Sequence, residues 1–150
     1  TGLTLDYTFD VAMQGVLGVG QNITDWNEEQ MATATKKIAE YKKHRNLIQK
    51  GEVYRLKSPF EGNKTAIQYT DKDKKESVVL CYNLGEAMSG SIYETQSSNM
   101  LRLQGLDENK LYQIENGEST FSGKYLMEVG VKWPVRGAYK SKIIKINSAK

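Results

Sequence analysis

The spacing of hydrophobic positions changes once along this chain, at Gly51. Asn27 followed by Gln30 forms a capping-box pattern, and Gly51 supplies a stop. We therefore predict a helix over residues 28–50 that buries one face on a larger body. Its buried stripe follows alternating steps of three and four residues, the period of an amphipathic helix, and consists of Met31, Ala34, Ile38, Tyr41, Arg45 and Ile48.

A shorter helical pattern lies near the N-terminus, and "LGVG" at residues 17–20 is short enough for one strand. The succession of helix, strand and helix matches the alternating strands and helices of an α/β barrel. One strand and two helices cannot close a barrel, so we interpret residues 1–51 as the tail of a (β/α)8 barrel. The apolar positions of the first helix are Leu5, Phe9, Ala12, Met13 and Val16.

Beyond Gly51 the period becomes two, which indicates strands. The segment 76–84 is apolar on both faces and is typical of a central, doubly covered strand. Residues 85–100 are expected to form an irregular loop. The pattern predicts a mainly β fold in which residues 52–150 form a C-terminal antiparallel β-sandwich, with strands at 52–57, 65–70, 76–84, 100–104, 110–115, 124–133 and 141–147.

Composition narrows the possible partners. The 150 residues carry 21 Lys and Arg against 18 Asp and Glu, a net charge of +3 that is spread along the chain. This balance argues against a nucleic-acid partner, and no apolar run is long enough to cross a membrane. No signal peptide is visible and the chain begins with Thr1, so we expect a piece of a longer polypeptide. A single cysteine is compatible with a cytoplasmic location.

Three glycines after an apolar run, Gly15, Gly18 and Gly20, invite comparison with phosphate-binding loops. A Walker loop needs a Lys-Ser or Lys-Thr after its last glycine, and none follows Gly20. A dinucleotide fingerprint has the order G-x-G-x-x-G between a strand and a helix, whereas this order is G-x-x-G-x-G. We therefore interpret the glycines as a helix stop and as close backbone approaches within a packed strand, and expect no cofactor.

Two acidic residues could in principle do glycosidase chemistry, which needs a pair of carboxylates. Asp6 and Asp10 lie four residues apart on the first predicted helix and would share a face. A small self-contained enzyme that uses this pair remains one of the three hypotheses for the chain, beside the two given below. Such pairs are more often two solvated acids, which is the interpretation we favour.

The single cysteine and the single histidine offer little catalytic potential. Cys81 is predicted to be a small buried side chain on a strand. His44 lies among cations in "YKKHRN" and is predicted to be solvated on a helix flank. A nucleophile–histidine centre would need that base in a cleft, and metal sites that require paired histidines are excluded.

Aromatic residues on the predicted strand 124–133 could form a sugar-stacking platform. The face consists of alternating aromatic and aliphatic side chains, which more often indicates core. A carbohydrate-binding β-sandwich module nevertheless remains the alternative to the leading interpretation. The residues of that face are Tyr125, Met127, Val129, Val131 and Trp133.

Five segments in order along nearly the whole chain together resemble the C-terminal end of glycoside hydrolase family 36 α-galactosidases. They are "LDYTFDVAMQGVLGVG", "EEQ…KKIAEYKKHRNLIQKGEVYRLKSP", "LRLQGLDENKLYQIENGE", "SGKYLMEVGV" and "WPVRGAYKSKIIKI". The resemblance implies the last strand and helix of a catalytic barrel followed by a C-terminal β-sandwich. It also implies a parent enzyme that removes terminal α-galactose from melibiose, raffinose and related sugars with retention and without cofactor or metal.

The resemblance assigns no catalytic residue to this chain. Retention requires a nucleophile and an acid/base about 5 Å apart. In the family the nucleophile lies in a K-x-D motif on an earlier barrel strand and the acid/base on a later one, and Asp6 and Asp10 match neither position. The expected partners are the upstream barrel of the same polypeptide, galactosides bound by the parent enzyme, and further copies in a homo-oligomer.

Overall fold

The computed structural model describes residues 3–85, 99–115, 117 and 119–149. Two helices, α1 (Leu5–Ala12) and α2 (Glu28–Lys50), precede the strands, with a short 3-10 turn η1 (Ile23–Asp25) between them. Neither of these helices, nor α3 described below, is long and apolar enough to cross a membrane. The loop expected at 85–100 falls mostly outside the described residues.

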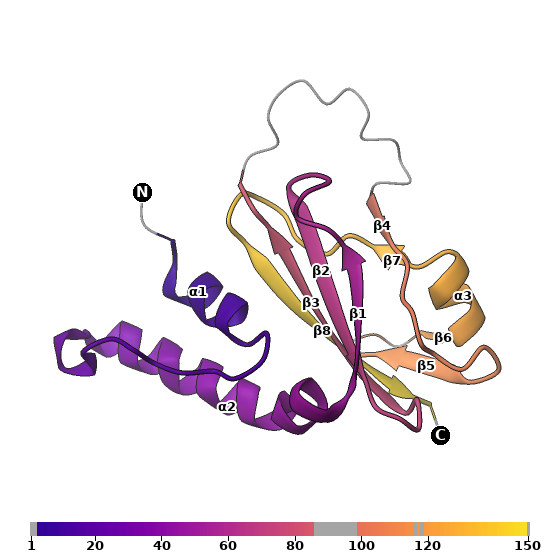
Figure 1. Ribbon diagram of the computed structural model, residues 1–150, viewed down its shortest axis with the longest axis horizontal. Coiled ribbons are helices and arrows are strands. Elements are labelled where there is room, and N and C mark those ends of the chain that lie inside the picture. The colour runs from indigo at the N-terminus through magenta and orange to yellow at the C-terminus, as the bar shows by residue number, and fades with distance from the viewer. Residues whose placement is uncertain (1–2, 86–98, 116, 118, 150) are drawn as a thin grey trace.

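The strands form a six-stranded antiparallel sheet in the order β1-β2-β3-β8-β5-β6 (Figure 1). A second sheet pairs two short strands, β4 with β7. The predicted strands at 52–57, 65–70, 76–84, 110–115 and 141–147 are confirmed in type and position, and 100–104 is shortened to two residues. The bounds are β1 Glu52–Lys57, β2 Lys64–Thr70, β3 Glu76–Asn83, β4 Met100–Leu101, β5 Leu111–Ile114, β6 Thr120–Ser122, β7 Val131–Lys132 and β8 Ser141–Ser148.

The predicted strand at 124–133 is wrong over its first part, and only its end is extended, as β7. Residues 123–128 form helix α3 (Gly123–Glu128), whose cap is the Ser122 hydroxyl accepting the N–H of Tyr125 at 3.1 Å. Leu126 is fully buried from this helix, while Tyr125 is 42% exposed. An alternating apolar pattern over six residues also fits a short helix when a capping serine precedes it.

The predicted strand at 17–20 is also absent. These residues have no regular structure, and none of the described strands pairs with them. A strand exists only where a neighbour accepts and donates its backbone hydrogen bonds. Gly18 and Gly20 have open space around them, so none of the described residues makes the close approach expected there. Gly15, expected to stop the first helix, lies three residues after that helix ends at Ala12 and has a φ of +131°.

Strand β3 supplies both cores, as its two apolar faces predicted. Val79 and Cys81 enter a cluster between the sheet and α3, β4 and β7. Val78, Leu80 and Tyr82 enter a second cluster beneath α1 and α2 on the other face. Side chains of a strand alternate between faces, so one central strand joins the two layers seen on either side of the sheet in Figure 1.

Helix α2 has the predicted bounds and cap, but its buried face is shifted. The Asn27 N–H donates to Gln30 Oε1 at 3.0 Å, and the Gln30 N–H donates to Asn27 Oδ1 at 2.9 Å, which closes the capping box. Met31 and Arg45 are exposed. The stripe that faces the sheet and α1 includes one lysine and one histidine, and its members are Ala34, Lys37, Tyr41, His44 and Ile48.

Candidate functional site

Residues 3–23 present an unusual amount of apolar surface to solvent. Val16 is 81% exposed and Leu3 54%. Isolated exposed apolar residues are normal, but a run of them on one short segment marks an interaction surface. The residues concerned are Leu3, Val11, Val16, Val19 and Ile23.

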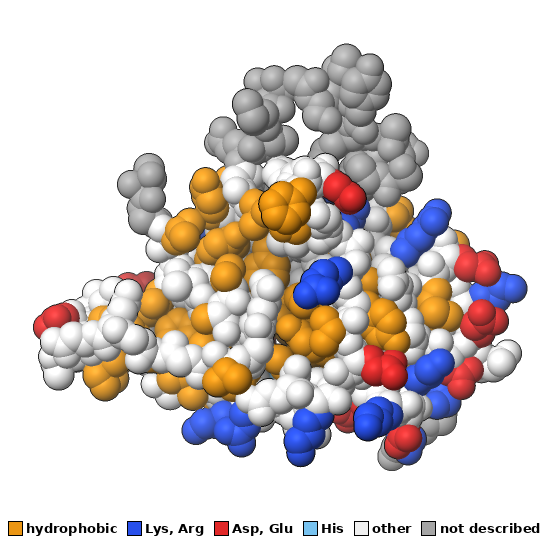
Figure 2. Space-filling model, in the orientation of Figure 1, with side chains coloured by type: hydrophobic (Ala, Val, Ile, Leu, Met, Phe, Trp, Pro, Cys, Tyr) orange, Lys and Arg blue, Asp and Glu red, His pale blue; other side chains and the backbone are white. Residues whose placement is uncertain are grey.

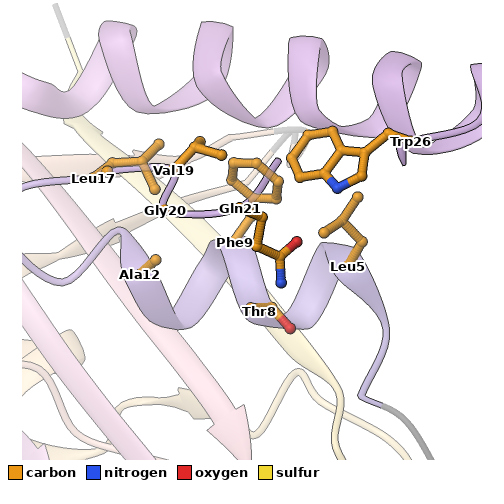
Figure 3. Close-up of a pocket in the computed structure, with 10 residues that line it drawn as sticks. Leu5, Thr8, Phe9, Ala12, Leu17, Val19, Gly20, Gln21 and Trp26 are labelled. Carbon is orange, nitrogen blue, oxygen red and sulfur yellow. The ribbon is translucent and has the colours of Figure 1, made fainter. Parts of the chain in front are cut away.

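An apolar pocket of about 220 Å³ opens between α1 and the segment that follows it (Figure 3). The Phe9 and Trp26 rings form part of its wall and meet edge to face, with centroids 6.4 Å apart. None of the described side chains that line it is ionisable, and the polar ones are Thr8 and Gln21. The pocket can hold an apolar side chain, but its lining offers no acid, base or phosphate ligand. The other lining residues are Leu5, Ala12, Leu17, Gly18, Val19 and Gly20.

Below this surface a buried polar cluster joins the helices to the sheet, and it corrects the interpretation of Asp10 as a solvated acid. Asp10 is 3% exposed. Its Oδ1 accepts a hydrogen bond from Lys37 Nζ of α2 at 2.7 Å, and its Oδ2 accepts one from the Ser141 hydroxyl of β8 at 2.6 Å. We call these three residues the Asp10 cluster. Asp6, by contrast, is exposed as predicted and lies 3.6 Å from the same ammonium.

Lys37 is charged within this cluster. Its side chain is only 11% exposed. Burial by itself lowers the pKa of this ammonium, but the hydrogen bond and the charge of Asp10, with smaller contributions from Glu40 and Asp6, outweigh burial and raise the pKa. The pair therefore persists as an ion pair, and both Asp10 oxygens are used for structure.

Three tyrosine hydroxyls hold backbone carbonyls at the same junction. Tyr82 of β3 donates to the Asp10 carbonyl at 2.6 Å, and Tyr41 of α2 donates to the Gly15 carbonyl at 2.6 Å. Tyr7 of α1 donates to the Asn83 carbonyl at 3.3 Å. Buried polar groups of this kind require partners, so helix and sheet are joined by directed bonds as well as apolar contact.

His44 is buried, which overturns the prediction that it is solvated. It is 8% exposed and sits on the sheet-facing side of α2. Burial lowers its pKa below the ordinary 6.5, and the Lys145 ammonium of β8 lowers it further. Glu40 and Glu115 act in the opposite direction and Lys43 adds to the lowering, but the net pKa stays depressed.

We expect this burial to make stability fall in mild acid. Because the folded-state pKa of His44 lies below the unfolded one, the unfolded chain takes up the proton first as pH drops below about 6.5. The free energy of unfolding keeps its full value above that pH. It falls as the pH approaches the lowered folded-state pKa of His44, with a slope no steeper than about 1.4 kcal/mol per pH unit. Urea unfolding between pH 5.5 and 8 would measure it. His44→Gln keeps every carboxylate, so an unchanged slope in this variant would assign the effect to other groups.

The other candidate residues of the sequence analysis have structural roles. Cys81 is fully buried as predicted, and burial raises the pKa of its thiol to about 12. Among the described residues, no three His, Cys, Asp or Glu side chains come together to hold a metal ion. The sugar platform that remained an alternative for 124–133 does not form, because α3 breaks the alternation. Tyr125 stacks on Phe121, and the Trp133 indole N–H donates to Asn83 Oδ1.

Sequence reasoning missed the Asp10 cluster. Its members lie in α1, α2 and β8, and their spacing in the chain carries no signal of contact. The one available hint was a lysine in phase with the apolar stripe of α2, three residues after Ala34 and four before Tyr41.

The chain is similar to proteins of one known family. The model of the glycosyl hydrolase family 36 C-terminal domain matches residues 64–146. Alpha-galactosidase AgaA of Geobacillus stearothermophilus is 39% identical over 129 residues, covering 85% of this chain and 17% of that protein. Alpha-galactosidase Mel36A of Lactobacillus acidophilus is 34% identical over 134 residues, covering 89% of this chain and 17% of that protein.

Solved structures agree. The crystal structure of GH36 alpha-galactosidase AgaB from Geobacillus stearothermophilus superposes with a TM-score of 0.83 at 33% identity, over 99% of this chain and 20% of that one. A variant of AgaA from the same organism, in complex with raffinose, gives a TM-score of 0.84 at 32% identity over the same shares. The chain thus spans less than about a quarter of the length of these relatives. Because the family model covers more than half of it, the chain belongs to glycosyl hydrolase family 36 and contains that family's C-terminal domain.

Proposed function

We propose that this chain is the non-catalytic C-terminal portion of a retaining α-galactosidase that hydrolyses terminal α-D-galactosyl residues of oligosaccharides such as melibiose and raffinose. Its task is to complete and stabilise the catalytic barrel. The named relatives are alpha-galactosidases, and one of them was crystallised with raffinose. The observation that carries the proposal is the apolar surface of residues 3–23 with its pocket, which has the character of a contact face.

We propose that residues 1–51 are the end of the barrel and residues 52–150 the β-sandwich. The change of hydrophobic period at Gly51 supports this division, and so does the end of α2 at Lys50. On this proposal the unpaired segment 17–20 is the final barrel strand, whose neighbours come from the upstream part of the polypeptide. The Asp10 cluster then spans the two units.

No residue of the chain is proposed to be catalytic, and no cofactor or metal is proposed. The buried ion pair with Lys37 supports this for Asp10, because a nucleophile or acid/base must face the substrate. The upstream barrel would carry both carboxylates and bind the galactoside. A cytoplasmic location and assembly into a homo-oligomer complete the proposal; the buried thiol of Cys81 is compatible with that location.

A chimera tests this proposal. Replacing the matching segment of AgaA from Geobacillus stearothermophilus with this chain should give an enzyme that hydrolyses raffinose, measured as released galactose. The isolated chain should release none. AgaA truncated before the matching segment serves as the control and should be inactive, because its barrel lacks its last strand and helix. Hydrolysis by the isolated chain, or a folded chimera without activity, would contradict the proposal.

A further inference from the structure

Among the described residues outside 3–23, one aromatic side chain is almost completely exposed. Phe60 is 97% exposed, in the loop between β1 and β2. The loop is an ordered turn, since the Ser58 carbonyl accepts the N–H of Glu61 at 3.2 Å and the Ser58 hydroxyl accepts the N–H of Phe60 at 3.2 Å. Pro59 restricts the backbone at the position where such turns favour it. The ring is thus displayed by a defined turn, and little ordering would be needed to bury it.

Two further exposed side chains belong to the same end of the sheet. The N–H of Leu84 donates to the Asn63 carbonyl at 2.7 Å, which ties the end of β3 to the Phe60 loop, and Leu84 is 36% exposed. Tyr139, just before β8, is 49% exposed. We call Phe60, Leu84 and Tyr139 the sheet-end patch. Figure 1 shows the loop, the end of β3 and the start of β8 together, and Figure 2 shows hydrophobic side chains gathered there.

Tyr139 adopts an unfavourable backbone conformation in this patch. Its φ is +50°, a region that bulky side chains avoid. Its ring packs edge to face on Tyr7 of α1, with centroids 6.2 Å apart. Such conformations persist where the surroundings enforce them, and they gather at functional positions.

Helix α1 begins against the patch, which indicates what covers it. Besides its ring contact, Tyr7 bonds the Asn83 carbonyl beside Leu84, and Leu3 just before α1 is 54% exposed. On the proposed function, the helix end that the upstream polypeptide leads into lies beside the sheet-end patch. Alpha-galactosidase AgaA is matched over only 17% of its length, so a relative of this kind has ample chain outside the match.

We propose that the sheet-end patch is a second docking surface for the upstream polypeptide, separate from the pocket at α1, with Phe60 as its anchor. The inference rests on the proposed function. Phe60 and Leu84 carry no polar group to orient a sugar, whereas a preformed aromatic projection is what a pocket on a protein surface accommodates. The patch would fix the sandwich against the barrel from the sheet side.

Thiol accessibility tests the proposal, because the native Cys81 is buried and its pKa is about 12, which leaves it unreactive near neutral pH. Phe60→Cys is labelled with N-ethylmaleimide in the isolated chain and in the AgaA chimera, and the site is read by peptide mapping. We expect labelling to slow at least about tenfold in the chimera. Leu111→Cys is the control: Leu111 is 52% exposed near the opposite end of β8, and its labelling should be equal in both.

The outcomes separate the two proposals. An active chimera in which the Phe60→Cys thiol reacts as fast as in the isolated chain overturns the docking surface and leaves the proposed function intact. A chimera without activity removes the proposed function and this inference with it. A third outcome combines three results: the isolated chain self-associates, Phe60→Ser alone makes it monomeric, and labelling of the Phe60→Cys thiol is not slowed in the chimera. In that case the patch binds a second copy, and the inference is wrong.

Discussion

Asp10→Ala should lower the free energy of unfolding by about 3–5 kcal/mol, the cost typical of breaking a buried ion pair. The substitution leaves the Lys37 ammonium 11% exposed without its nearest anion, which lay at 2.7 Å. It also removes the acceptor of the Ser141 hydroxyl on β8. Urea unfolding followed by tryptophan fluorescence measures the loss, since Trp26 packs on Phe9 of the affected helix.

Two comparisons make this result specific. Asp6→Ala removes a carboxylate that faces the same ammonium at 3.6 Å but is 60% exposed, so it should cost at most about 1 kcal/mol. Adding Lys37→Met to Asp10→Ala should restore part of the stability, because no uncompensated buried charge remains. If Asp10→Ala costs no more than Asp6→Ala, the cluster does not join the helices to the sheet as described.

The same cluster shows where sequence patterns stop being informative. The period of α2 and its capping box depend on near neighbours, and both were predicted from the sequence. Lys37 and His44 occupy the buried stripe only because Asp10 pairs with one and the other stays neutral against β8. Such partners are distant in the chain, so a stripe drawn from Met31 at steps of three and four residues assigned those places to Ile38 and Arg45 instead.

The two segments where a predicted strand is missing, wholly or in part, differ in their physical cause. At 124–133 the alternation was real, but a serine cap and the burial of Leu126 favour a helical turn over extension. At 17–20 the composition suits a strand, yet no described strand pairs with it. Strand β3 was predictable because both its faces are apolar and its neighbours β2 and β8 lie in the same chain.

Gly51 was predicted to stop α2, and it does so for a reason other than the usual one. A glycine after a helix commonly adopts a left-handed conformation, whereas Gly51 has a φ of −74° and a ψ of 165°, which any residue can adopt. What requires glycine is space. A Cβ there would lie 2.5 Å from the Leu47 carbonyl oxygen and 2.9 Å from the Thr70 carbonyl oxygen.

We therefore expect Gly51→Ala to lower the free energy of unfolding by about 1–3 kcal/mol through overpacking alone. Both obstructing atoms are backbone, one from the last turn of α2 and one from the end of β2, so relief requires the helix to move from the sheet. Gly62→Ala, in the β1–β2 loop with nothing within 4 Å, is the matched control and should stay within about 0.5 kcal/mol of the parent in urea unfolding. Equal stability of the two variants would mean that α2 separates from β2 at little cost, and the rigid junction at Gly51 would then have to be abandoned. A loss confined to Gly51→Ala would show that the proposed barrel end and the sandwich are held at a fixed distance by backbone contact as well as by the Asp10 cluster.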